Sequence, residues 1–287
     1  MNALNGAVTA LFDVLLTPLE LVGEEFALIM VSGVFGILAL IAFKYISSQK
    51  GIKAAKDKIK GHMIEIRLYQ DDLVIVAKAI GKVLLRNFQY VAYNFGPFIP
   101  LAVPFVFVLA QLVVRYAFVP IPVTPDYQHL LSGQATMISV EMADGHFDDV
   151  TALEMTLPEG LAPLKPGKRA RIAATGRFYQ EIVATAPGAY EIEFKLKGET
   201  IVKRLYAGET EARMMQGERV QSLFESSLWP AEEKFGGESA IARITFIYPE
   251  SNLGWLPMSG PLGVIVVFLV ASMAFGFAVL KPLGITI

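Results

Sequence analysis

The fold class is decided by the stretch Phe26–Phe43, which reads FALIMVSGVFGILALIAF and contains no charged residue. Eighteen residues in a helix cover about 27 Å, close to the thickness of the hydrocarbon core of a bilayer. Two further uncharged runs of 20 residues follow, Phe95–Val114 and Pro261–Leu280. We therefore predict three transmembrane helices, at residues 26–43, 95–119 and 260–281. We expect the first to be a retained anchor rather than a cleaved signal peptide, because no basic residue precedes it and lysines follow it.

The charges between these runs predict the orientation of the chain. Lys44–Asn94 holds ten Lys and Arg against four Asp and Glu, whereas Pro120–Met258 holds thirteen against nineteen. Basic residues beside transmembrane helices stay in the cytoplasm. We expect residues 44–94 and the C-terminus to be cytoplasmic, and residues 1–25 and 120–258 to be extracytoplasmic. This topology describes a multi-pass protein of a cell (inner) membrane, which we expect to be prokaryotic.

The N-terminal segment, residues 1–25, precedes the first apolar run. Its apolar residues recur at helical spacing over Gly6–Gly23, with Asp13 and Glu20 as the only charges there. The pattern predicts an amphipathic helix lying at the extracytoplasmic interface. A frayed apolar tail is the alternative.

The cytoplasmic segment, residues 44–94, predicts two helices that form an antiparallel hairpin. Apolar residues recur at steps of three and four on both sides of a turn at Gln70–Asp72, in which Asp71 or Asp72 is suited to cap the second helix. The stripe containing Ile59 and Ile66 should face Val76 and Ile80. Lysines concentrate on the first helix: Lys50, Lys53, Lys56, Lys58 and Lys60.

The extracytoplasmic segment, residues 120–258, has the pattern of an antiparallel β-sandwich that we expect to be immunoglobulin-like. Short runs of β-forming residues are separated by turn signals such as Asp144-Gly145. The expected strands are Thr136–Met142, Val150–Leu157, Arg169–Thr175, Tyr190–Leu196, Thr200–Tyr206 and Ile241–Tyr248. A helical insertion is expected at Glu218–Leu228. The fold class is thus an α+β membrane protein with three transmembrane helices, a cytoplasmic helical hairpin and an extracytoplasmic β-sandwich.

Residues suited to catalysis are sparse. The chain has no cysteine and only three histidines, none at metal-ligand spacing from another. The stretch Ala143–Val150 (ADGHFDDV) has the composition of a tight turn, and a cation site is the less favoured interpretation. No nucleotide-binding loop or nucleophile elbow is present. We therefore expect no enzyme activity, no cofactor and no bound metal.

Polar residues within the apolar runs are the candidates for a site between the helices. Gln111 and Arg115 lie one turn apart near the end of the second run, and Ser32 and Ser272 lie in the first and third. Close helix packing is the ordinary role of small residues in membranes. The alternative is a polar groove formed by these four residues. In addition, Arg115 either pairs with a carboxylate directly before the first run, Glu24 or Glu25, or extends to the membrane interface without a carboxylate partner.

The order of these segments resembles the Oxa/YidC-type superfamily of membrane-protein insertases. The stretch from Lys58 to Phe118 looks most like prokaryotic members of the branch that contains the third subunit of the ER membrane protein complex. The resemblance covers Gly6–Phe118 and the last apolar run, and it rests on architecture and a loose pattern. The first run lacks the arginine that many insertases carry there, and the segment between the last two runs is much larger than usual for that branch.

The resemblance implies a membrane-protein biogenesis factor or chaperone that moves short polar segments of client proteins into the bilayer. The lysine cluster would then contact lipid headgroups, ribosomal RNA or a nascent chain. A second interpretation is that the cluster only sets the orientation of the chain. The alternative function is a membrane-anchored scaffold whose extracytoplasmic domain binds an envelope protein.

Overall fold

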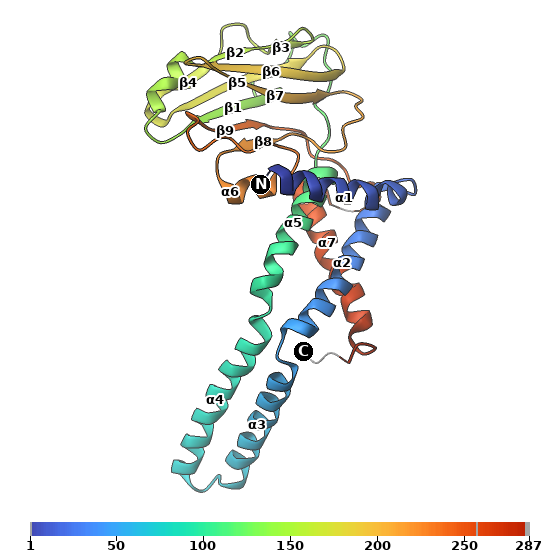
Figure 1. The fold of residues 1–287 in the computed structure, drawn as a ribbon, viewed down its shortest axis with the longest axis vertical. Coiled ribbons are helices and arrows are strands. Elements are labelled where there is room, and N and C mark those ends of the chain that lie inside the picture. Colours follow the sequence, from blue (N-terminus) through green and yellow to red (C-terminus); the bar gives the residue numbers. More distant parts are fainter. Residues whose placement is uncertain (1, 257, 285–287) are drawn as a thin grey trace. The chain divides into compact units, whose positions relative to one another are not determined.

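A computed structural model describes residues 2–256 and 258–284 of the chain and gives it an α+β fold (Figure 1). The chain divides into two compact units. One contains residues 1–28 and 107–266, and the other contains residues 29–106 and 267–287.

Three stretches of the fold are helical, long and apolar enough to cross a membrane, as predicted: Glu24–Ile46, Leu73–Tyr116 and Gly260–Leu280. The first is α2 and the last is α7. The second holds two helices, α4 (Leu73–Phe95) and α5 (Phe98–Tyr116), which are separated at Gly96 and Pro97. Its 44 residues are about twice the length that one crossing needs.

Helices α3 (Gln49–Leu68) and α4 pack side by side as the predicted pair (Figure 1). The carboxylate of Asp72 caps α4 by accepting hydrogen bonds from the backbone amides of Val74 and Ile75. The predicted packing stripe on α4 is displaced by one residue. Ala79 is fully buried, whereas Ile80 is 45% exposed and Leu73 is 80% exposed, because a small side chain allows the two helices to approach closely.

Small residues and phenylalanines pack α2 against α7 in the same unit. A Cβ atom on Gly36 would lie 2.1 Å from the backbone oxygen of Ser272, so the two helices touch through their backbones there. The ring of Phe35 lies 5.4 Å from that of Phe268 and 6.2 Å from that of Phe105 on α5. The three helices therefore meet through aromatic contacts at this level.

The β domain (β1–β9 with α6, Leu223–Leu228) belongs to the other unit and contains two antiparallel sheets. One has the order β3-β5-β1-β9-β8 with β4 paired to β5, and the other has the order β2-β6-β7. The strands are β1 (Thr136–Met142), β2 (Glu154–Thr156), β3 (Leu161–Pro163), β4 (Ala170–Ile172), β5 (Arg177–Ala184), β6 (Gly188–Leu196), β7 (Glu199–Ala207), β8 (Glu218–Val220) and β9 (Ile241–Phe246).

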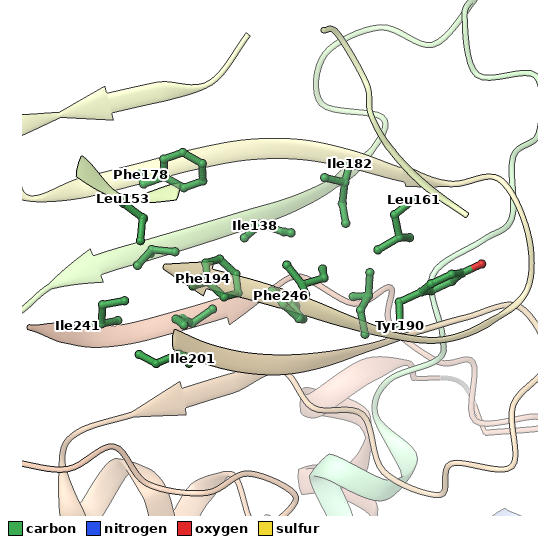
Figure 2. Packing of buried hydrophobic residues seen from close by; sticks show 14 of the residues in the cluster. Ile138, Leu153, Leu161, Phe178, Ile182, Tyr190, Phe194, Ile201, Ile241 and Phe246 are labelled. Carbon is green, nitrogen blue, oxygen red and sulfur yellow. The ribbon is translucent and has the colours of Figure 1, made fainter. Parts of the chain in front are cut away.

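Both sheets contribute to one hydrophobic core (Figure 2). Ile138 of β1 and Phe178 of β5 are fully buried, as is Phe194 of β6 in the other sheet. The rings of Phe194 and Phe246 lie 6.3 Å apart. Alternate residues of β6 and β7 are buried, which is the pattern of strands with one face in a core.

The expected strands were partly wrong. Val150–Leu157 begins within a 3₁₀ helix, η1 (Phe147–Ala152), and only the short β2 follows. Arg169–Thr175 divides into β4 and a 3₁₀ turn, η2 (Ala173–Thr175). The predicted insertion Glu218–Leu228 is helical only in α6, because its first residues pair with β9 as β8. The strands β3 and β5 were missed.

Candidate functional site

Helix α1 (Asn2–Glu20) and the last two turns of α5 form a buried polar contact in the unit that holds the β domain. One side of α1 buries Phe12 and Leu16, while Leu11, Val14 and Leu15 on another side are at least half exposed. The N-terminal segment is therefore helical and two-sided, as its sequence pattern predicted.

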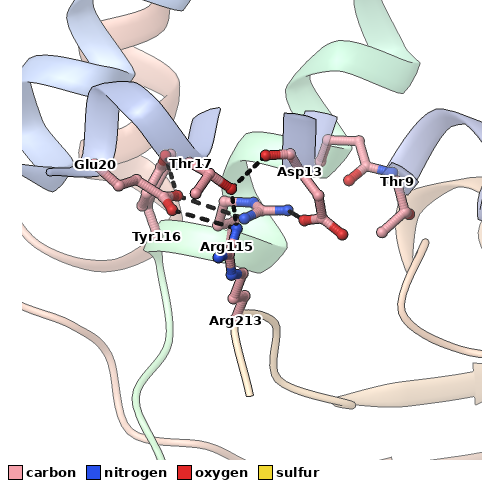
Figure 3. Close-up of polar contacts among 8 residues, drawn as sticks. Thr9, Asp13, Thr17, Glu20, Arg115, Tyr116 and Arg213 are labelled. Carbon is pink, nitrogen blue, oxygen red and sulfur yellow. Dashed lines mark hydrogen bonds and ion pairs between the residues drawn. The ribbon is translucent and has the colours of Figure 1, made fainter. Parts of the chain in front are cut away.

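The guanidinium of Arg115 is the centre of this contact, and its side chain is only 2% exposed (Figure 3). It donates hydrogen bonds to the carboxylates of Asp13 and Glu20, the second at 3.4 Å. The hydroxyl of Tyr116 donates to the same Glu20 oxygen at 2.9 Å. Asp13 and Glu20 are seven residues apart, which places both on one face of α1. We call these four residues the arginine cluster.

Gln111 extends the polar contact by one turn of α5. Its side-chain amide nitrogen donates to the hydroxyl of Thr9 on α1 at 2.8 Å, and the residue is almost completely buried. Among the buried side-chain atoms that the structure describes, Gln111 Oε1 and Arg115 Nε have no hydrogen-bond partner. A buried polar atom without a hydrogen-bond partner costs about 1–3 kcal/mol. The hydrogen bonds between α1 and α5 therefore have to offset the cost of these two atoms.

The β domain also bonds to this face of α1. Arg213 donates to Thr17 and lies 3.8 Å from a Glu20 oxygen (Figure 3). The side-chain amide of Asn5 donates to the carbonyl of Ser226 in α6 at 3.1 Å. Helix α1 is thus bonded through one polar face both to the end of α5 and to the β domain.

The predicted partners of Arg115 were wrong. Its carboxylate partners within the described chain are Asp13 and Glu20, not Glu24 or Glu25. Sequence proximity to the first apolar run suggested the latter pair. However, the face of α1 that packs on α5 presents its own carboxylates directly to the guanidinium. The carboxylate of Glu25 lies instead beside Gly254.

The four residues of the predicted groove are not brought together in either unit. Gln111 and Arg115 bond to α1, as described above. In the other unit, the hydroxyl of Ser272 donates to the carbonyl of Ser32 at 3.0 Å, across the α2–α7 contact. Together with Gly36, this bond gives the serines the packing role that was the first interpretation of small residues there.

The helical pair α3–α4 carries two exposed surfaces of different chemistry. The predicted lysine cluster is fully on the surface of α3: Lys50, Lys53, Lys56, Lys58 and Lys60. Apolar side chains that are 59–80% exposed surround the turn between the helices: Met63, Ile64, Leu68, Leu73 and Val74. We call this second set the apolar tip. Sequence reasoning missed it, although Ile64 and Leu68 lie off the helical phase of the packing stripe.

An ion pair between Glu65 and Lys82 links α3 to α4 beside the apolar tip. The imidazole of His62 lies 2.9 Å from one oxygen of Glu65, and Lys82 of α4 lies 3.4 Å from the other oxygen. The hydrogen bond from His62, together with the charge of Lys82, lowers the pKa of Glu65. Both partners therefore keep Glu65 ionised, which favours the link between α3 and α4.

The turn Ala143–Val150 has bonds that a tight turn requires. Gly145 adopts a left-handed backbone conformation, with φ at 84°. Asp149 is bonded to Lys197 at 2.7 Å and to His146 at 3.0 Å, and these contacts lower its pKa. Within the described residues, no group of three or more His, Asp or Glu side chains could hold a metal ion.

The β domain has an open depression of about 790 Å³ on the β6–β7 side. Its lining combines Tyr190 and Tyr206 with the ion pair of Arg204 and Glu191, whose atoms lie 3.0 Å apart. Tyrosine and arginine are enriched at protein interfaces.

Comparisons with protein-family models, with curated proteins and with solved structures found no match to this chain. The function is therefore argued from the residues of the chain itself.

Proposed function

We propose that the chain is an insertase-like biogenesis factor or chaperone for membrane proteins, and not an enzyme. The observation that carries the proposal is the apolar tip on a basic helical hairpin. Each side chain of the apolar tip is more than half exposed. A contiguous apolar patch in contact with water is unfavourable, and such patches often mark a surface that binds a protein or a membrane. An apolar segment of a client protein is a fitting ligand, because it would bury the tip while the lysines attract its anionic flank or the nucleic acid of a ribosome.

The topology we propose places this hairpin in the cytoplasm of a prokaryotic cell, with the β domain outside the inner membrane. The excess of Lys and Arg in residues 44–94 supports this orientation. A client segment emerging from synthesis would then meet the apolar tip before it meets the bilayer. Membrane lipids are the second partner in this proposal.

The residues that were expected to line a groove are already bonded to other residues of the chain. Gln111 is bonded to Thr9 of α1, so it would be available to a client only after α1 moves. Ser32 and Ser272 are bonded across α2 and α7. We therefore place client capture at the hairpin, and we propose that transfer proceeds along the lipid-facing sides of the helices.

Site-specific photocrosslinking tests client capture. A photoreactive residue at Leu68 or Leu73 should crosslink to newly made membrane proteins, and a matched position on the basic face, Lys56, should crosslink much less. The variant with Leu68→Ser and Leu73→Ser should lose client capture, whereas Lys56→Ser should keep most of it. Equal crosslinking at all three positions would contradict capture by the apolar tip.

The second candidate function is a scaffold that recognises an envelope protein through the β domain. The depression lined by Tyr190, Arg204 and Tyr206 favours it. The two antiparallel sheets with one core also support an immunoglobulin-like class for this domain, which is a common binding module. Affinity purification from native membranes separates the two functions. Co-purifying ribosomes or nascent chains favour the insertase, and a stable envelope complex that Tyr206→Ala disrupts favours the scaffold.

A further inference from the structure

Helix α6 of the β domain has its polarity reversed relative to a helix on a water-soluble domain. Ser226 and Ser227 are buried, while Leu223 is 62% exposed and Phe224 is 66% exposed. The two serine hydroxyls donate to carbonyls within α6 at 2.9 and 2.6 Å, so they are satisfied inside the protein. Soluble helices bury their apolar side. We call Leu223, Phe224 and Leu228 the α6 patch.

Two contacts hold α6 beside the end of a membrane-spanning helix within its own unit. The ring of Trp229, directly after α6, stacks on Phe118 with centroids 5.7 Å apart. Phe118 follows the last residue of α5, Tyr116, by only two positions. The hydrogen bond from Asn5 to the carbonyl of Ser226 fixes α6 to α1 as well. Helix α6 therefore lies where α5 leaves the hydrocarbon.

Other exposed apolar side chains of this unit adjoin the same helix ends. Leu11, Val14 and Leu15 are exposed along α1, which is bonded to Arg115 in the last turn of α5. Trp255 is 71% exposed and precedes α7 by five residues. Tryptophan is enriched at the boundary between membrane and water. The α6 patch and these side chains are thus exposed apolar groups of one unit, on elements that adjoin the ends of the spanning helices.

We propose that the α6 patch inserts into the lipid leaflet on the side of the β domain. The ligand is the boundary of headgroups and acyl chains, since apolar side chains with a polar opposite side are what such boundaries bind. The β domain is then fixed to the bilayer by its own side chains and by α1, in addition to its covalent link to α5 and α7. This inference does not depend on insertase function.

Fluorescence quenching in lipid nanodiscs tests the insertion. The full chain has no cysteine, so Phe224→Cys can carry a single environment-sensitive fluorophore, with Lys168→Cys in an exposed turn as the matched control. A nitroxide on the lipid near the headgroup should quench the label at 224 several-fold more than the label at 168. Iodide in the water should quench the label at 168 several-fold more than the label at 224.

Two results overturn the proposal. Equal iodide quenching at both positions would show that the α6 patch faces water. Protection of position 224 from both quenchers would show that protein covers the patch, for example a second copy of the chain. Leu223→Cys provides a second labelled position. Both side chains are mostly exposed, so neither substitution removes core packing.

Discussion

Replacing Arg115 by methionine should release α1 from α5. The substitution removes the only cation that the structure shows bonded to Asp13 within the described chain, and the nearer of the two cations beside Glu20. It also leaves both carboxylates at a contact where the guanidinium was almost completely buried. Methionine retains much of the apolar volume, so the effect reports charge rather than a cavity.

The expected size follows from the burial of the three side chains. Removing one member of a buried ion pair costs about 3–5 kcal/mol. The side chains of Asp13 and Glu20 are 43% and 21% exposed and regain some hydration, so we expect about 2–3 kcal/mol. Because 1.4 kcal/mol is a factor of ten, the open population of α1 should rise about 30- to 150-fold.

Cysteine labelling measures this opening. Leu16 on α1 is fully buried, and Leu16→Cys is the only thiol in the chain. When Arg115→Met is added, the reaction of this thiol with a water-soluble maleimide in nanodiscs should become about 30- to 150-fold faster. The matched control is Arg213→Met, because Arg213 is half exposed and 3.8 Å from Glu20, and such pairs contribute about 0–1 kcal/mol. Labelling of the Arg115 variant within threefold of the unmodified background, or equal to the control, would refute this account of the arginine cluster.

Three further predictions concern other parts of the fold. Gly36→Ala should destabilise the α2–α7 contact, because the added Cβ would lie 2.1 Å from the backbone of α7. The measurement is a lower thermal midpoint of unfolding. In the control Gly61→Ala, the added Cβ has no atom within 4 Å, so this substitution should stabilise α3 by about 1 kcal/mol. Lys203 of β7 forms a buried ion pair with Glu232, so Lys203→Met leaves that carboxylate buried without its cation. The substitution should lower the unfolding free energy of the β domain by about 3–5 kcal/mol in denaturant. An unchanged midpoint would contradict this. In intact cells, Ser48→Cys should resist a membrane-impermeant thiol reagent and Ser132→Cys should react, and the reverse result would exchange the two sides of the membrane.

Much of the fold could be predicted because several helices and strands are determined by the sequence of one continuous segment each. The uncharged runs predicted the spanning helices, and the two aspartates at the turn predicted a cap of α4 by Asp71 or Asp72, of which the structure uses Asp72. Strands β6 and β7 alternate clearly, so both were predicted as strands, and the structure pairs them. In contrast, β5 is buried almost continuously towards its end and pairs with three strands. Its sequence lacks the alternation by which an isolated strand is recognised.

The candidate site was predicted in part. Helical spacing identified Gln111 and Arg115 as polar groups on one face of the second apolar run, and both are buried at a polar contact. Their partners depend on tertiary packing of α1, which local sequence does not encode. The spacing of Asp13 and Glu20 on one face of an amphipathic helix was the available signal for this contact.

Insertion of a client protein into proteoliposomes tests the central claim most directly. The purified chain should insert a single-span client with a short translocated tail well above the level of lipid alone. The substitutions Leu68→Ser and Leu73→Ser, or deletion of residues 51–91, should reduce insertion to that level, while Tyr206→Ala in the β domain should leave it unchanged. Insertion that matches lipid alone with the unmodified chain, or that fails only when the β domain is altered, would contradict the proposed function.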